Sequence, residues 1–91
     1  MNKTNMTVDG IDYSVEHEVE GNMEHIEVKD INDSPISVAI IDHNHETVEV
    51  VYMFDDYVEG DELTPVPYNY HEYTSVSNIA EWMASTHPIN G

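Results

Sequence analysis

The sequence predicts an α+β domain in which a mostly antiparallel, four-stranded β-meander carries a C-terminal α-helix on one face. Two observations support this fold class. Four short segments with strand character follow one another with turn signals between them, and a single helical pattern closes the chain. The 91 residues, 40% of them hydrophobic, are enough for one small domain with a thin core. Residues 1–91 are therefore interpreted as a single domain.

The first two strands are predicted from alternation. The stretch Asp12–Glu20 alternates strictly between two sets of side chains, which is the pattern of a half-buried strand. One set is Tyr13, Val15, His17 and Val19, and the other is Asp12, Ser14, Glu16, Glu18 and Glu20. Residues 23–31 alternate in the same way after a Gly-Asn turn. Residues 1–6 are polar, and we expect them to be disordered.

The next two strands are predicted from apolar runs. Residues 36–41 and 47–54 are rich in β-branched side chains and too short for stable helices. Both runs are apolar on both faces, which is typical of central strands. Residues 42–46 form the connecting hairpin loop. Since little of the chain remains to cover the second face of the sheet, we expect self-association into a homodimer.

The C-terminal part is predicted to contain an irregular segment and a helix. Residues 55–73 carry Pro65 and Pro67, which permit at most an edge strand. Four tyrosines of this segment could form a recognition surface or cover the second face of the sheet. They are Tyr57, Tyr68, Tyr70 and Tyr73. Residues 75–86 repeat apolar side chains at helical spacing, and Pro88 follows, so the helix is placed there.

Charge is the most unusual property of the chain. Nineteen acids face two lysines and no arginine, which gives a net charge of −17. Residues 1–45 hold ten of the acids and residues 46–91 hold nine, so the charge is spread through the domain. Binding of nucleic acid or of anionic lipid needs Lys and Arg, and phosphoryl transfer needs positive charge around the phosphates. We therefore expect neither a nucleic-acid partner nor a membrane partner.

The same composition bears on the cellular compartment. Cysteine is absent, which excludes disulfides and thiolate metal sites and suits a reducing environment. No run of 18 apolar residues occurs, and the first residues lack the apolar stretch of a signal peptide. A cytoplasmic protein is expected.

Three patterns were considered as sites of chemistry. His43 and His45 lie between acids and could bind a metal ion with a further ligand from elsewhere, but polar loop residues of an acidic protein give the same pattern. His17 is interpreted as a half-buried, hydrogen-bonded histidine rather than a pH switch. Pairs of carboxylates suited to acid–base catalysis arise by chance among nineteen acids. We therefore expect no metal, no cofactor, no catalytic residues and no enzymatic activity.

The acids have three interpretations. They could serve solubility, although −17 is far more than solubility requires. They could reflect adaptation to high salt. They could also imitate DNA, since residues i and i+2 of a strand lie about 6.7 Å apart and so place carboxylates at intervals comparable to those of backbone phosphates. The candidate phosphate-mimicking residues are Asp12, Glu16, Glu18, Glu20, Glu24, Glu27, Asp55, Asp56, Glu59, Asp61 and Glu62.

In size, acidity and the look of two strands, D-Y-S-V-E-H-E-V-E and M-E-H-I-E-V-K-D, the whole chain resembles the small DNA-mimic anti-restriction proteins of T-even bacteriophages. The resemblance implies a non-enzymatic inhibitor that acts as a homodimer in the host cytoplasm. Its target would be a host DNA-binding protein: a McrBC-type restriction nuclease first, and a nucleoid protein or CRISPR effector as alternatives. The second hypothesis is a protein–protein adaptor that uses the Tyr-rich segment and an apolar sheet face, with acidity serving only solubility or halophilic adaptation.

Overall fold

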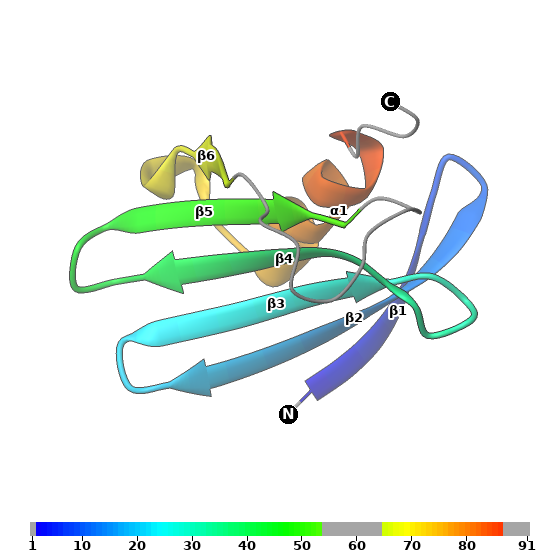
Figure 1. Ribbon diagram of the computed structural model, residues 1–91, viewed down its shortest axis with the longest axis horizontal. Coiled ribbons are helices and arrows are strands. Elements are labelled where there is room, and N and C mark those ends of the chain that lie inside the picture. Colours follow the sequence, from blue (N-terminus) through cyan, green and yellow to red (C-terminus); the bar gives the residue numbers. More distant parts are fainter. Residues whose placement is uncertain (1, 54–64, 87–91) are drawn as a thin grey trace.

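The computed structural model describes residues 2–53 and 65–86. It is an α+β fold, with one antiparallel sheet whose strands follow sequence order and one C-terminal helix (Figure 1). The elements are β1 (Asn2–Val8), β2 (Ile11–Glu20), β3 (Met23–Lys29), β4 (Pro35–Asp42), β5 (Thr47–Tyr52), β6 (Val66–Tyr68), the 3-10 helix η1 (Tyr70–Glu72) and α1 (Val76–Thr86). The predicted fold class is confirmed, but among the described residues the sheet has six strands where the sequence predicted four.

The first additional strand is β1, in a region that was expected to be disordered. Asp9 and Gly10 have φ angles of 53° and 81°, as in the two-residue type I′ turn that suits a hairpin. This turn pairs Val8 with Ile11, and the antiparallel register continues to Asn2 opposite His17. The prediction was wrong because β1 is mostly polar and exposed. β1 is stabilised by its backbone pairing with β2, and such pairing requires no pattern of hydrophobic side chains in the sequence.

The second additional strand is β6, which pairs with β5 at the other edge of the sheet. It lies inside the segment 55–73 that was predicted to be irregular, and it has the edge position that its prolines allow. The four strands that the sequence predicted are all present with closely similar bounds. The helix is also present, and its first turn is capped by the Ser75 hydroxyl, which accepts a hydrogen bond from the Asn78 N–H at 3.1 Å.

The core lies between one face of the sheet and α1. The sheet contributes buried side chains from alternate positions of β2 to β5, and α1 contributes its apolar stripe. The buried hydrophobic residues are Val15, Ile26, Val28, Ala39, Ile41, Val48, Val50, Tyr52, Ile79, Ala80 and Met83. Tyr68 packs edge-on against Trp82, with ring centroids 4.9 Å apart, and so extends the core toward β6. We call this face of the sheet the helix side.

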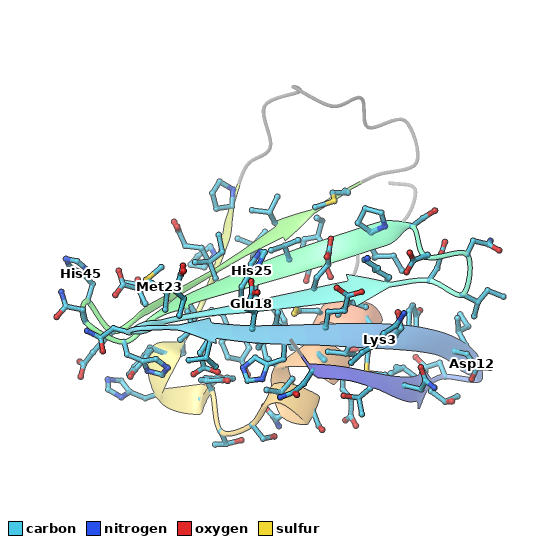
Figure 2. All side chains as sticks on the ribbon, turned by 90° about the horizontal axis from the view of Figure 1, so that it is seen from below. Lys3, Asp12, Glu18, Met23, His25 and His45 are labelled. Atoms are coloured by element: carbon cyan, nitrogen blue, oxygen red, sulfur yellow. The ribbon has the colours of Figure 1, made fainter. Side chains whose placement is uncertain are left out.

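The opposite face of the sheet, which we call the open face, has no described helix or strand packed on it (Figure 2). The strand registers place the following side chains on it: Lys3, Asn5, Thr7, Asp12, Ser14, Glu16, Glu18, Glu20, Met23, His25, Glu27, Lys29, Val38, Ile40, Asp42, Thr47, Glu49 and Val51.

Within the described part of the chain, no helix is long and apolar enough to cross a membrane.

Candidate partner-binding surface

The acids of β2 form the longest run of charge on the open face. Asp12, Glu16, Glu18 and Glu20 share this face because side chains alternate along a strand, and the run from Asp12 to Glu20 spans about 27 Å. Glu18 and Glu20 are exposed, and no ion pair reaches either of them within residues 2–53 and 65–86. Figure 2 shows Glu18 on the side of the sheet away from α1. These positions agree with the sequence prediction.

The middle of this run is neutralised by Lys29. The Lys29 Nζ lies 3.1 Å from a Glu16 carboxylate oxygen, 4.0 Å from Glu27 and 3.6 Å from Asp33. Lys3 of β1 lies directly opposite Glu16 in the register. The hydrogen bond to Glu16 raises the pKa of Lys29, and the neighbouring carboxylates add to the effect. Because Glu16 and Glu27 face each other across β2 and β3, Lys29 relieves a like-charge pair.

Two acids of the open face were missed by the sequence analysis. Asp42 ends β4, and Glu49 stands in the middle of β5 between apolar neighbours. Register places Glu18, His25, Ile40 and Glu49 in one line across four strands. A second line joins Glu20, Met23, Asp42 and Thr47. The unpaired acids of β2 and Glu49 of β5 are therefore separated by three strand spacings, or about 14 Å. Reading β5 by strict alternation could have identified Glu49.

An apolar patch lies between these acids. Its members are Met23, Val38, Ile40 and Val51, of which Met23 and Ile40 are both 39% exposed. The patch accounts for the apolar run of the two central strands, which carry hydrophobic side chains on both faces as predicted. We call these four residues the apolar patch. It gives the open face a mixed character, with acids on two sides of exposed hydrophobic surface.

One predicted site residue lies on the wrong face. Glu24 was placed among the phosphate-mimicking acids, but register puts it opposite Val19 and Ile41, on the helix side. Its side chain is 14% exposed and is held by other side chains, so it is not part of the open face. The error follows from treating both Glu24 and Glu27 as outward-facing, although Glu24 shares the parity of Ile26 and Val28.

Glu24 is the centre of a hydrogen-bonded cluster that sequence reasoning did not find. Its Oε1 accepts hydrogen bonds from the Tyr73 hydroxyl and from His17 Nε2, each at 2.7 Å, and its Oε2 accepts one from His43 Nε2. His43 Nδ1 in turn accepts a hydrogen bond from the Tyr70 hydroxyl at 2.7 Å. The cluster therefore joins β2, β3 and the β4–β5 turn to the segment around η1. We call these five residues the Glu24 cluster.

The electrostatics of the Glu24 cluster follow from its donors. Partial burial acts to raise the pKa of Glu24, but the hydrogen bonds from His43, Tyr73 and His17 outweigh it, so the pKa lies below its ordinary value. Burial raises the pKa of Tyr73, and the bond to the Glu24 carboxylate raises it further. The carboxylate is thus held ionised and the phenol neutral. His17 is half-buried and hydrogen-bonded, as the sequence indicated.

The two loop histidines do not converge on one point. His43 joins the Glu24 cluster, whereas His45 Nδ1 bonds Asp42 Oδ2 at 2.8 Å on the exposed turn. Hydrogen bonds from His45, through its side chain and its backbone N–H, hold the pKa of Asp42 below its usual range. Among residues 2–53 and 65–86, no three His, Asp or Glu side chains are placed to hold a metal ion.

The tyrosines of the C-terminal segment pack on the helix side where they are described. Tyr68, Tyr70 and Tyr73 are half-buried against the core. The hydroxyls of Tyr70 and Tyr73 are used within the Glu24 cluster. These side chains therefore lie on the same face of the sheet as α1 and do not cover its second face, the alternative role that the sequence allowed. Five candidate acids and one tyrosine lie outside the described residues: Asp55, Asp56, Tyr57, Glu59, Asp61 and Glu62.

Comparisons with known proteins add no relative. The chain matches no protein-family model, no curated protein and no solved structure.

Proposed function

We propose that this protein is a non-enzymatic inhibitor whose open face occupies the DNA-binding site of a host protein. The first candidate target is a McrBC-type restriction nuclease. The observation that carries the proposal is the placement of exposed, unpaired acids on a rigid sheet face, in a chain with a net charge of −17. A DNA-binding site supplies the Lys and Arg side chains that such a face requires.

The spacing of the acids supports this target class. Glu18 and Glu20 stand about 6.7 Å apart along β2, and Glu49 lies about 14 Å away across the sheet. This separation is comparable to the roughly 12 Å width of the major groove, which also has phosphates on both sides. Between the two sets of acids lies the apolar patch, where a duplex would present base edges. The open face therefore offers charge at two borders and less polar surface between them.

The charge of the whole chain supports fast association. A molecule with a field this negative is attracted to a basic cleft over long range, so its association rate rises at low ionic strength. The fold supplies the rigidity that imitation of a stiff polymer requires, since the acids stand on strands rather than on loops. Neutralisation by Lys29 restricts the surface to the end of the sheet where Glu18, Glu20 and Glu49 lie.

The test is competition with duplex DNA for a purified McrBC-type nuclease. The changed variant carries Glu18→Gln, Glu20→Gln and Glu49→Gln. The matched control carries Glu46→Gln, Glu72→Gln and Glu81→Gln, which removes the same charge from exposed positions outside the strands. We expect the wild type and the control to displace a labelled duplex and the open-face variant to lose at least tenfold in affinity.

Salt provides the second readout of the same experiment. Binding through several ion pairs should weaken steeply as salt rises, because counterions screen the charges on both surfaces. If the two triple variants lose affinity equally, only net charge matters and the placement of acids on the open face does not. If duplex DNA and the protein bind the same nuclease together, the proposed imitation of DNA is wrong.

The adaptor hypothesis remains as a second candidate because of the apolar patch. Exposed Met23 and Ile40 on a sheet face are suited to contact with another protein. In that case affinity for the partner should survive moderate salt and the open-face Gln variant, and it should fall on Ile40→Asn. The described tyrosines do not favour this alternative, since they pack within the fold.

A further inference from the structure

The free edge of β1 is unusual among the surfaces of this chain. The two edges of the sheet are β1 and β6, and neither strand contains an acid. The β6 edge is three residues long, includes Pro67 and directly follows Pro65, so few of its N–H groups can pair. The β1 edge is seven residues long, contains no proline and carries Lys3, one of the two cations. It is also an edge at which the repulsion of other acidic chains is weakest.

The hairpin turn determines which backbone groups of β1 are free. A type I′ turn closes on a hydrogen-bonded pair, here Val8 and Ile11, and such pairs then alternate along an antiparallel ladder. The N–H and C=O groups of Lys3, Asn5 and Thr7 therefore point away from β2. No other backbone hydrogen bond reaches them within residues 2–53 and 65–86. Unpaired groups on a strand of this length are a template for one more strand.

We infer that two copies of this chain pair through the β1 edges to form one continuous sheet. A two-fold axis perpendicular to the sheet keeps the open faces of both copies on the same side. Residues of the two β1 strands that lie directly opposite each other must then point to the same face of the sheet. Centring the axis on Asn5, the middle residue of β1, satisfies this condition and uses the full strand. Asn5 then faces the partner's Asn5, and Lys3 faces the partner's Thr7.

This register uses every outward-pointing group. The pairs centred on Lys3, Asn5 and Thr7 are those with free N–H and C=O groups, so each can exchange two hydrogen bonds with the other copy. The register is also complementary in charge. Thr7 donates a hydrogen bond to Asp12 Oδ1 at 2.7 Å within its own chain. Lys3 of one copy, facing the partner's Thr7, is therefore within reach of the partner's Asp12.

The acidity of the chain permits this contact better than contact through the open faces. The two β2 strands would lie about 14 Å apart, separated by β1 and its copy. That distance exceeds the Debye length of about 10 Å at moderate salt, so repulsion between their acids is largely screened. Contact through the open faces would instead press Glu18 and Glu49 against their own copies. The inference is independent of the proposed function, although it would double the width of the acidic face.

The test combines molecular mass with disulfide crosslinking. Because the chain has no cysteine, Asn5→Cys introduces a single thiol. Directly opposed residues of a hydrogen-bonded pair have Cα atoms about 5.5 Å apart, within the range for a disulfide. We expect Asn5→Cys to form a covalent dimer on mild oxidation. Lys3→Cys and Thr7→Cys should stay largely monomeric alone and should crosslink when they are mixed.

Sedimentation velocity gives the complementary readout. Asn5→Pro removes an outward N–H and leaves the β1–β2 ladder intact, so it should abolish the dimer while circular dichroism stays unchanged. The dimer fraction of the wild type should rise with salt, opposite in sign to binding of a basic partner. The inference is overturned if the wild type stays monomeric at high concentration and moderate salt. It is equally overturned if a dimer survives in folded Asn5→Pro, or if Lys3→Cys crosslinks alone as fast as Asn5→Cys.

Discussion

The hydroxyl of Tyr73 is the most informative single atom for the stability of the fold. It donates to the Glu24 carboxylate at 2.7 Å and ties the segment after η1 to β3, across 49 positions of sequence. Tyr73→Phe removes this bond without opening a cavity, and it leaves the carboxylate with its two histidine donors. The variant therefore isolates one charge-assisted hydrogen bond.

The size of the effect follows from the environment of the bond. Hydrogen bonds to charged groups contribute about 1.5–3 kcal/mol net. Glu24 is partly buried, with 14% of its side chain exposed, so we place the loss in the free energy of unfolding at the lower end, about 1.5 kcal/mol. For a domain of this length, that loss lowers the melting temperature by roughly 6–12 °C.

The assay is urea unfolding followed by circular dichroism, with Tyr13→Phe as the control. Tyr13 is also half-buried on the helix side, and its hydroxyl makes no side-chain hydrogen bond within the described residues. We expect Tyr13→Phe to change stability by less than about 0.5 kcal/mol. Glu24→Gln should cost about 2–3 kcal/mol, and its combination with Tyr73→Phe should cost less than the sum. If Tyr73→Phe and Tyr13→Phe are equivalent, the Glu24 cluster does not stabilise the fold.

The same cluster predicts a dependence on pH. Because the pKa of Glu24 is lowered on folding, the stability it contributes is complete above its unfolded value of 4.5 and is lost as the pH falls through the folded value. The difference in unfolding free energy between wild type and Glu24→Gln should therefore be constant near neutral pH and shrink in acid. Glu81→Gln, which removes an exposed charge from α1, should show no such convergence. A difference that stays constant down to the acid unfolding transition would contradict the lowered pKa.

Three further expectations follow from the fold and its charge. Raising salt should increase the melting temperature, because it screens the self-repulsion of a chain at −17; an unchanged melting temperature would mean that repulsion costs little. Gly21→Ala should lower the free energy of unfolding by about 1 kcal/mol, because Gly21 has a φ of +60°. No clash should add to this cost, since nothing lies within 4 Å of the added Cβ. Equal stability would show that this turn can relax. Burial raises the pKa of Tyr52 to about 12, and it also raises the pKa of Tyr73. Ultraviolet titration at about pH 11 should therefore show fewer than six ionised tyrosines in the folded protein and all six in urea.

The fold was largely predictable because its signals are local. Alternation over residues 12–20 identified β2 to within one residue of its observed start, and helical spacing identified α1. β1 could not be found in this way, because a polar edge strand gains its stability from pairing and from the turn at Asp9 and Gly10. β6 was recognised only as a segment that could at most be an edge strand.

The candidate surface was predictable only in part, for a different reason. Parity within β2 placed Asp12, Glu16, Glu18 and Glu20 on one face, and the structure agrees. What parity could not show is the partner of each acid, since those partners come from other strands. Lys29 neutralises Glu16 through register, and the donors of Glu24 come from residues far away in the sequence. Separating exposed acids from structural ones therefore required the tertiary fold.

Displacement by duplex DNA distinguishes imitation of DNA from any other way of binding the nuclease. A purified McrBC-type nuclease is bound to the immobilised protein and then challenged with excess duplex at low salt. We expect the duplex to elute the nuclease from the wild type. The variant with Glu18→Gln, Glu20→Gln and Glu49→Gln should not retain the nuclease at all, whereas the control with Glu46→Gln, Glu72→Gln and Glu81→Gln should. Retention of the nuclease in saturating duplex would contradict the claim that the open face takes the place of DNA.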